Sequence, residues 1–251
     1  MKIMSFNLLC YGSGEHSFSK RIMPVTKTIS KYMPDCLGVQ EAHIDWIKAL
    51  DENFSDYNYV GVGRDDGKEA GEFSAVFYKK DRFTLLDSGT FWLSETPEIP
   101  SKGWDSACIR ICSWAMLKDK TDGNEFVHMN THLDHIGKTA MLNGAQLVAQ
   151  RANETANGLP VILTGDFNVT PDSAPCKAIK DSGFKDSRDA AAKTDYSVTY
   201  HAFESENAAS AVIDYVFFKG NFIADSFSVI KDKVDGNLPS DHYPVLAELK
   251  F

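Results

Sequence analysis

The segment VILTGDFN, residues 161–168, combines a short apolar run with polar side chains at its end. Val161 to Thr164 are apolar or β-branched, and Gly165 ends the run. This length and composition favour a β-strand over a buried helix. Asp166 and Asn168 then follow two residues apart, and such residues share one face of an extended chain. The segment therefore predicts a buried strand that presents two polar side chains to one ligand.

Runs of the same kind recur along the chain. They predict strands at Lys2–Leu8, Cys36–Gln40, Phe73–Tyr78, Arg110–Leu117, Phe126–Thr131, Val212–Phe218 and Pro244–Leu249. Helical periodicity predicts helices at Phe18–Met33, Ile44–Leu50, Lys138–Ala156 and Asp172–Lys180, the last with Asp172 as its N-cap. The elements interleave without the strict alternation of a parallel doubly wound sheet. We therefore expect an α/β sandwich of mixed sheets covered by helices.

The composition is that of an ordinary globular protein. The chain has 251 residues, 43% of them hydrophobic, and no Pro/Gly-rich linker, so we expect one domain, residues 1–251. No run of about 18 apolar residues could span a membrane, and the N-terminus lacks the apolar segment of a signal peptide. Five scattered cysteines form no C-x-x-C pair. We expect a reduced cytoplasmic protein without a membrane span or an obligate protein partner.

The net charge of −9 bears on the class of substrate. Proteins that grip long nucleic acid usually carry a basic stripe, and only short basic pairs such as Lys20-Arg21 occur in this sequence. Tight nonspecific binding of duplex DNA is therefore disfavoured. A nuclease is not excluded, because a bound metal ion reverses the sign of the local field.

The predicted strand ends carry most of the candidate chemistry. Six of them have an Asn, Asp, Glu or His at or beside them: Asn7, Glu41, His132, Asp166 with Asn168, Asp214, and Asp241 with His242. A single such residue usually caps a strand or faces solvent. Six together predict side chains that converge on one crevice. Asp214 stands within an apolar run, where a buried carboxylate needs a partner such as a histidine.

A zinc cluster at His128, His132, Asp134 and His135 is the alternative reading of this region. Residues four apart on a strand are roughly 13 Å apart. Zinc ligands lie about 2 Å from the metal, so His128 and His132 cannot readily share one ion. The spacing disfavours zinc at this position.

Six short motifs occur in order along the chain. They are MSFN (4–7), VQE (39–41), NTHL (130–133), GDFN (165–168), IDY (213–215) and SDHYP (240–244). Together they resemble the signature of the endonuclease/exonuclease/phosphatase superfamily, which includes deoxyribonuclease I, deadenylases, inositol polyphosphate 5-phosphatases and neutral sphingomyelinases. The resemblance covers nearly the whole chain. It implies a four-layer α/β/β/α sandwich, with two mixed β-sheets packed face to face and helices outside.

The resemblance also implies a phosphoesterase that depends on Mg²⁺ or Mn²⁺. Glu41 would be the principal metal ligand, with Asn7 beside it and Asp241 completing the site. A hard cation prefers oxygen ligands and keeps several waters, so one or two carboxylates suffice.

The phosphate side of the site follows from the same resemblance. His242, oriented by Asp214, would act as a general base or as a phosphate-stabilising cation. Asp166 would activate the attacking water, and Asn168 would donate a hydrogen bond to a nonbridging phosphate oxygen. Positioned water and neutralised oxygens are what phosphoryl hydrolysis requires.

Two further residues, Glu72 and Arg110, resemble those of particular subfamilies. Glu72 occupies the place of a glutamate that deoxyribonuclease I, sphingomyelinases and 5-phosphatases pair with the histidine of the NTHL motif, here His132. The implied hydrogen bond would raise the pKa of His132, and the imidazolium would protonate the leaving oxygen or bind phosphate. Arg110 resembles a phosphate-contacting arginine of the same relatives, with a surface arginine as the alternative.

These residues favour a hydrolase that acts on a phosphodiester or phosphomonoester: a nucleotide, an oligonucleotide or a small phosphorylated metabolite. A non-catalytic binding module on the same fold would be expected to lack Glu41, Asp166 or His242. A sphingomyelinase-type lipid phosphodiesterase would need an exposed apolar hairpin or a secretion signal, and neither is evident. The pairing of Glu72 with His132 disfavours the exonuclease III branch of the superfamily.

Overall fold

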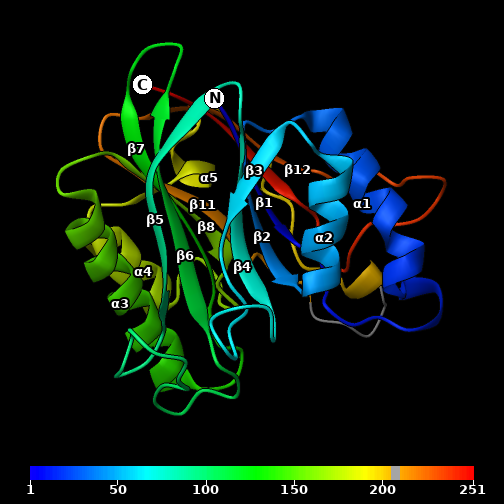
Figure 1. Ribbon diagram of the computed structural model, residues 1–251, viewed down its shortest axis with the longest axis horizontal. Helices are drawn as coiled ribbons and strands as arrows, with labels where there is room; N and C mark the ends of the chain where they lie inside the picture. The colour runs from blue at the N-terminus through cyan, green and yellow to red at the C-terminus, as the bar shows by residue number, and fades with distance from the viewer. Residues whose placement is uncertain (205–209) are drawn as a thin grey trace.

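The computed structural model describes residues 1–204 and 210–251 and shows two mixed β-sheets packed face to face (Figure 1). In this part of the chain the larger sheet has seven strands, in the order β10 (Lys193–Thr194), β12 (Ile223–Val229), β13 (Val245–Lys250), β1 (Lys2–Asn7), β2 (Cys36–Ala42), β4 (Phe73–Lys79) and β3 (Tyr57–Val60). The smaller sheet has six, in the order β5 (Phe83–Trp92), β6 (Ile111–Asp119), β7 (Glu125–His132), β8 (Val161–Asp166), β11 (Asp214–Lys219) and β9 (Lys185–Asp186).

Helices cover the outer faces and complete the four-layer sandwich that the sequence predicted. Helices α1 (Phe18–Tyr32) and α2 (Ile44–Asn53) lie beside the larger sheet, and α3 (Lys138–Ala156) and α4 (Ala174–Asp181) lie beside the smaller one (Figure 1). The remaining helical turns are the short helix α5 (Ser187–Ala190) and the 3₁₀ helices Gly14–His16 and Ala202–Glu204. Among the described residues, no helix is long and apolar enough to cross a membrane.

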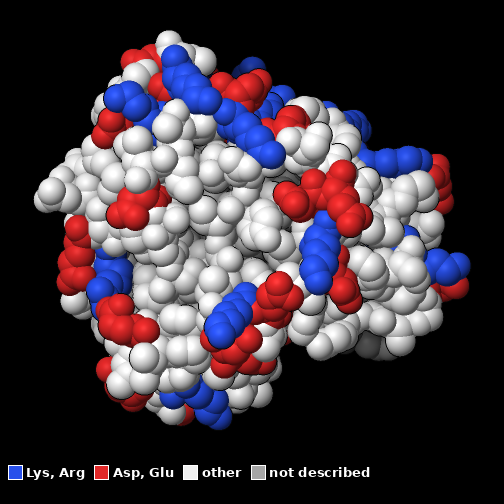
Figure 2. All heavy atoms as spheres, in the orientation of Figure 1, with Lys and Arg blue, Asp and Glu red and all other residues white. Residues whose placement is uncertain are grey.

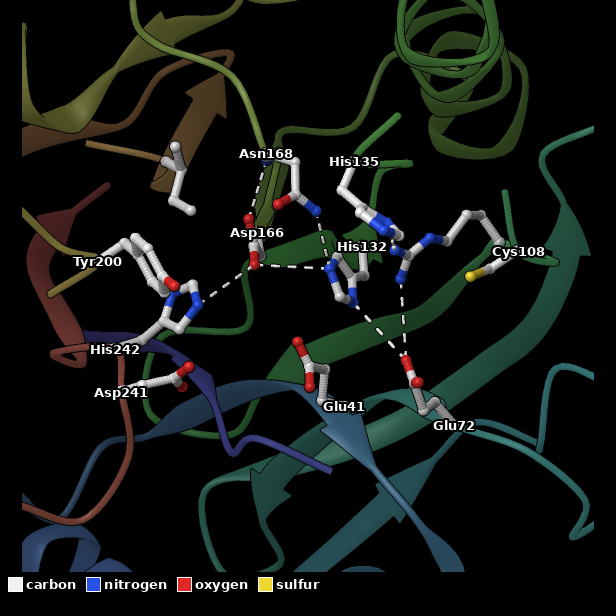
Figure 3. A pocket seen from close by; sticks show the side chains of 12 residues that line it. Glu41, Glu72, Cys108, His132, His135, Asp166, Asn168, Tyr200, Asp241 and His242 are labelled. Atoms are coloured by element: carbon white, nitrogen blue, oxygen red, sulfur yellow. Dashed lines mark hydrogen bonds and ion pairs between the residues drawn. The ribbon is translucent and has the colours of Figure 1, made fainter. Parts of the chain in front are cut away.

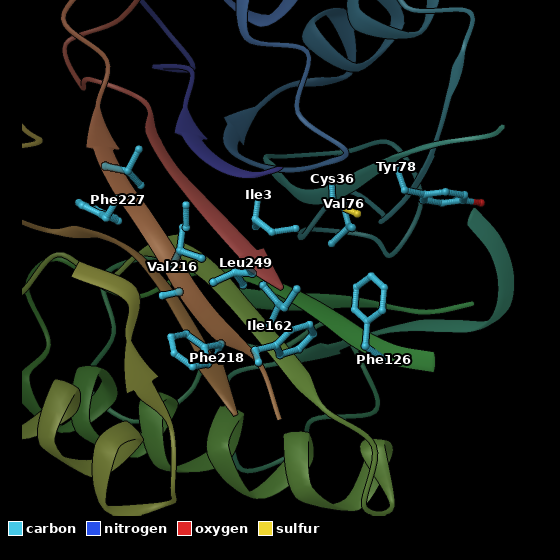
Figure 4. Packing of buried hydrophobic residues seen from close by; sticks show 14 of the residues in the cluster. Ile3, Cys36, Val76, Tyr78, Phe126, Ile162, Val216, Phe218, Phe227 and Leu249 are labelled. Carbon is cyan, nitrogen blue, oxygen red and sulfur yellow. The ribbon is translucent and has the colours of Figure 1, made fainter. Parts of the chain in front are cut away.

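The sequence of strand β1 is apolar on both faces because both faces are covered. Ile3 joins the cluster between the two sheets, whereas Met4 and Phe6 join the cluster under α1 and α2. Residues along a strand alternate between faces, so a strand covered on both sides reads as a continuous apolar run. Figure 4 shows the inter-sheet cluster, in which Ile3 lies among side chains from both sheets, Ile162 among them.

A buried polar network joins the two sheets beneath the strand ends. Gln40 donates from Nε2 to Ser5 Oγ (3.1 Å) and to Asn130 Oδ1 (2.6 Å), and Thr164 Oγ1 lies 3.0 Å from the same Asn130 oxygen. Gly38 makes room for it, because a Cβ there would lie 2.1 Å from Thr164 Oγ1. Buried polar groups need such partners. The network fixes the sheets relative to each other one or two residues before the candidate site residues.

Every predicted strand and helix is present, with ends displaced by a few residues. Strand β11 begins at Asp214, so Val212 and Ile213 precede it, and the N-cap of α4 is not Asp172. Ser173 caps that helix by accepting a hydrogen bond from the backbone N–H of Cys176. Asp172 instead accepts from the hydroxyl of Thr170 within the preceding turn.

Five strands in the described part of the chain were not predicted: β3, β5, β12 and the two-residue strands β9 and β10. The central residues of β5 are largely exposed, so it lacks an apolar pattern, and β12 carries Asp and Ser residues along its length. Strand β3 has only four residues. Apolar periodicity detects buried strands and fails for edges such as β3 and β5.

Candidate active site

A cavity of about 410 Å³ opens at one edge of the sandwich (Figure 3). Eight of the ten predicted site residues line it: Glu41, Glu72, Arg110, His132, Asp166, Asn168, Asp241 and His242. The other two, Asn7 and Asp214, contact these residues from behind. Four more residues complete the lining and were not among the predicted site residues: Cys108, His135, Tyr200 and Ile213.

Strand register explains why residues so distant in sequence meet here. In the smaller sheet, His132 pairs with Asp166 across β7 and β8, and Asp166 pairs with Asp214 across β8 and β11. In the larger sheet, β1 and β2 end at the same edge, next to the start of β4, which Glu72 precedes. The two rows face each other across the sandwich.

Asn7 links the two acidic groups at the centre. Its Nδ2 donates to Glu41 Oε1 at 3.0 Å and to Asp166 Oδ2 at 2.9 Å, while its Oδ1 accepts from the backbone N–H of Leu9 at 2.9 Å. The backbone N–H of Cys10 donates to Glu41 Oε2 at 3.0 Å. Burial raises the pKa of the Glu41 carboxyl, but these hydrogen bonds and the charge of His242 outweigh it, so the net pKa is lowered.

Two site residues have left-handed backbone conformations. Glu41 has φ +55° at an irregularity in β2, and Asn168 has φ +52° beyond the end of β8. Such conformations cost non-glycine residues free energy and gather at functional sites. Asn168 is therefore not extended, and the expectation that it shares a face with Asp166 by strand alternation was wrong. Its turn carries the side chain to His132 instead.

His242 is held firmly by Asp214. The imidazole Nδ1 lies 2.9 Å from Asp214 Oδ2 and 3.2 Å from Oδ1, and both side chains are buried. The other ring nitrogen, Nε2, lies 3.7 Å from Asp166 Oδ2. Burial lowers the pKa of His242, but the negative charges of Asp214 and Asp166 prevail and raise it to about 10.

His132 faces the same carboxylate from the other side of the cavity. Its Nε2 lies 3.5 Å from Asp166 Oδ2 and 3.0 Å from Asn168 Nδ2. Its Nδ1 is 3.9 Å from Glu72 Oε2, too far for the predicted hydrogen bond. Burial and the neighbouring charges of Arg110 and Arg64 lower the pKa of His132. The expected increase in that pKa was therefore wrong.

Glu72 is bound to arginine rather than to histidine. Arg64 Nη1 donates to Glu72 Oε2 at 2.6 Å, and Arg110 Nη1 lies 3.8 Å from the same oxygen. Arg110 is only 5% exposed and donates to His135 Nδ1 at 3.2 Å, so it is not a surface arginine. Arg64 lies in a glycine-rich loop, and nothing in its sequence pattern indicated a place beside the cavity.

Asp166 lies between the two imidazoles (Figure 3). Burial raises the pKa of its carboxyl to about 7, supported by the charge of Asp214 and opposed by that of His242. Asn168 donates its backbone N–H to Asp166 Oδ1 at 2.9 Å. The amide nitrogen of the Asn168 side chain bonds to His132 and to the carbonyl of Leu133, which leaves neither amide hydrogen directed at a phosphate.

The acidic groups fit a divalent cation. One ligand atom from each of Glu41, His132 and Asp166 lies within 4.8 Å of the others. Asp241 also lines the cavity, and burial and the negative charge of Glu41 raise its pKa. The carboxylates supply hard oxygen donors of the kind that magnesium and manganese prefer. Asn7 currently presents its nitrogen to Glu41, so it can join as an oxygen ligand only if its amide turns over.

Arg21 is a structural residue that the sequence did not reveal. It is fully buried and donates to the carbonyls of Leu8, Leu9, His16 and Pro239. These contacts tie the loop after β1 to the segment that leads to Asp241. They hold the two sides of the candidate cation site together.

Comparisons with known proteins show the family and the fold. Residues 4–242 match the model of the Endonuclease/Exonuclease/phosphatase family. The fold is similar to that of a mannosyl-6-phosphatase from Bacteroides thetaiotaomicron, with a TM-score of 0.94, 36% identity and full coverage of both chains.

Two sequence relatives are more distant. Protein angel of Drosophila melanogaster is 25% identical over 192 residues, which cover 69% of this chain and 54% of that protein. The probable RNA exonuclease NGL3 of Saccharomyces cerevisiae is 28% identical over 204 residues, 71% of this chain and 39% of that protein. The chain thus spans about half the length of these relatives, or less.

Proposed function

Because the chain belongs to the endonuclease/exonuclease/phosphatase family, we propose that it is a divalent-metal-dependent hydrolase that acts on a phosphomonoester of a small metabolite. The family comprises hydrolases of phosphate esters. A non-catalytic module is disfavoured, because Glu41, Asp166 and His242 are all retained and all line one cavity.

The position of Asp166 between two buried imidazoles carries the proposal. A phosphoryl group in the cavity would meet Nε2 of His242, whose Nδ1–H is fixed by Asp214, so the free N–H would bind a nonbridging oxygen. Asp166 would orient the attacking water toward phosphorus. Asn168 would act indirectly, by holding the ring of His132.

Glu41 would hold the cation together with Asp241, and with Asn7 once its amide has turned. When bound, magnesium or manganese would neutralise charge on the phosphate oxygens. The protein's own contribution is to fix the carboxylates in place. Asn7 and the backbone N–H of Cys10 already do this for Glu41.

Three observations support a small monoester as the substrate. The cavity volume suits a small molecule. On the face shown in Figure 2, Lys and Arg lie in small groups among Asp and Glu rather than in one basic stripe. The relative with 36% identity over its full length is a mannosyl-6-phosphatase.

An RNA end is the second candidate, favoured by the sequence relative described as a probable RNA exonuclease. Arg64 and Arg110 beside the cavity would suit either phosphate ester. A sphingomyelinase-type activity has no comparable support.

The test is a panel of hexose phosphates, nucleotides, a short RNA and sphingomyelin, assayed with Mg²⁺ or Mn²⁺ for released phosphate or cleaved product. We expect a hexose phosphate to turn over fastest and excess EDTA to abolish the reaction. Glu41→Ala should cost roughly 10³-fold or more, since metal catalysis supplies several kcal/mol. Glu52→Ala, an exposed glutamate on α2, is the matched control.

Full turnover in excess EDTA would refute the metal requirement. Preferential cleavage of RNA would show that the substrate is RNA and not a small phosphomonoester. The roles proposed for the catalytic residues would be unaffected. A folded Glu41→Ala variant with wild-type activity would contradict the role of Glu41 as the principal metal ligand.

A further inference from the structure

We propose that Cys10, His43 and Glu72 form a second metal site beside the cavity, which takes zinc or a similar borderline divalent cation and inhibits hydrolysis when occupied. One ligand atom of each residue lies within 4.8 Å of the others. The set combines a thiol, an imidazole and a carboxylate. Neither Cys10 nor His43 contributes its side chain to the proposed reaction.

Neighbouring strands of the larger sheet place the three residues. Cys10 follows β1, His43 directly follows β2, and Glu72 directly precedes β4. Strand β4 runs antiparallel to β2, and β1 runs parallel to it, so all three positions share one sheet edge. All three side chains are partly exposed, so an ion can reach them from solvent. Because the adjoining strands hold the backbone in place, ion binding would have to order little more than the side chains.

The donor set distinguishes this site from the one at Glu41. Thiolate and imidazole ligands favour zinc, whereas magnesium prefers oxygen. Tetrahedral zinc with ordinary bond lengths places a sulfur and a nitrogen ligand about 3.6 Å apart. The ligand atoms of the three residues lie within 4.8 Å of one another, so small side-chain rotations would bring them to the separation that zinc requires. A fourth position would remain for water.

Glu72 has a free oxygen for this purpose. Its contacts with Arg64, Arg110 and His132 all involve Oε2, and within the described residues no hydrogen bond to Oε1 is found. A cation at Oε1 can thus bind without breaking the ion pair with Arg64. The Nδ1 of His43 lies 3.5 Å from the hydroxyl of Tyr11, and the two ring centroids are 4.4 Å apart.

A second cluster of the same composition lacks this freedom. Cys108, Asp134 and His135 also lie within 4.8 Å of one another. Both oxygens of Asp134 already accept backbone hydrogen bonds. Oδ1 accepts from Ala107 and Cys108, and Oδ2 accepts from Ile136 and Gly137. The carboxylate of that cluster is committed to its loops, which makes it the natural control.

Occupation of the first site would act on the cavity through two residues. The backbone N–H of Cys10 holds Glu41, and Glu72 lies beside Arg64 and Arg110. A divalent cation bound there would draw both residues toward itself and place positive charge next to the magnesium ligands. The inhibition rests on the proposed function, whereas the metal binding itself does not.

Binding is tested by titrating Co²⁺ into the full chain in the presence of excess Mg²⁺, which keeps the oxygen site occupied. We expect a near-ultraviolet thiolate-to-cobalt absorption band that saturates at one ion per chain and that Zn²⁺ displaces. Cys10→Ser should abolish the band, and His43→Asn should weaken cobalt affinity by roughly tenfold or more. Cys108→Ser should retain it. The absence of any thiolate band, or its loss in Cys108→Ser but not in Cys10→Ser, would overturn the assignment.

Inhibition is tested with Zn²⁺ in the Mg²⁺-supported assay, each variant being compared with its own zinc-free rate. The zinc concentration for half-inhibition should rise by roughly tenfold or more in His43→Asn. His16→Asn, an exposed histidine outside the cluster, should behave as wild type. Equal inhibition of wild type and His43→Asn would refute the inhibitory role while leaving the cobalt result to decide the site.

Discussion

His242 and His132 occupy similar positions and differ in protonation. Each is nearly buried, with 4% and 5% of its surface exposed, and each turns Nε2 toward the same oxygen of Asp166. Each also has a second carboxylate near its Nδ1. Nevertheless, the pKa of His242 is raised to about 10, whereas that of His132 is lowered.

The contrast comes from contact distance and competing cations. Asp214 lies 2.9 Å from His242 and has no other side-chain partner among the described residues, whereas Glu72 lies 3.9 Å from His132 and is bound to Arg64. A carboxylate beside a histidine therefore does not by itself create an imidazolium. It must be in contact and not already neutralised. Opposite sides of one cavity thus provide a cationic and a neutral imidazole.

Asp214→Asn should have the largest effect of the changes that probe this contrast. We expect a loss of roughly 10²–10³ in kcat/KM, comparable to the removal of one oriented electrostatic contact in an active site. The pKa of His242 should fall, because the carboxylate of Asp214 that does most to raise it is gone. A steady-state assay across pH checks the rate, and a variant within threefold of wild type would contradict the account.

The same variant has a stability signature in metal-free protein. Because the folded pKa of His242 exceeds the ordinary value of 6.5, its stabilisation is fully present below pH 6.5 and is lost as pH rises to about 10. Denaturation by urea should therefore show the largest difference between wild type and Asp214→Asn below pH 6.5. That difference should shrink toward pH 10.

His132→Ala should have a smaller effect. A neutral imidazole that contacts phosphate contributes about 1.5–3 kcal/mol, so we expect roughly a 10–100-fold loss. The loss should be equal for a nitrophenyl phosphate and an alkyl phosphate. A much larger loss on the alkyl ester, whose leaving group needs a proton, would restore the acid role that the structure does not support.

Glu72→Gln should have the smallest effect and is the matched counterpart of Asp214→Asn. It removes a partly exposed ion pair with Arg64, so we expect a change of a few-fold, mainly in KM. The pKa of His132 should change little. If Glu72→Gln lowered kcat as strongly as Asp214→Asn, the two histidines would have equivalent partners and the contrast would fail.

The strand ends and motifs allowed the fold and most of the site to be predicted. Buried strands such as β8 have an apolar signal, and polar residues at their ends, such as Asp166, mark where the sheet edge lies. The roles assigned to these residues remain predictions. Their convergence follows from register, because His132, Asp166 and Asp214 are Cα partners across three strands.

The local electrostatics could not be predicted in the same way. The lowered pKa of His132 depends on its burial and on the charges of Arg110 and Arg64, and Arg64 contacts the cavity residue Glu72 from a glycine-rich loop with no periodicity. The direction of the Asn168 side chain depends on its positive φ, which its sequence context did not reveal. Tyr200, whose ring centroid lies 4.9 Å from that of His242, likewise comes from a segment without a strand or helix signal.

The most direct test of the contrast is an NMR titration of the two imidazoles in metal-free protein, assigned with His242→Gln and His132→Gln. We predict that His242 stays protonated at neutral pH and loses its proton near pH 10, with Nδ1–H in a hydrogen bond to Asp214. We predict that His132 stays neutral at neutral pH and throughout the range in which an ordinary histidine titrates. Titration of both rings near pH 6.5, or protonation of His132 at neutral pH, would contradict the contrast.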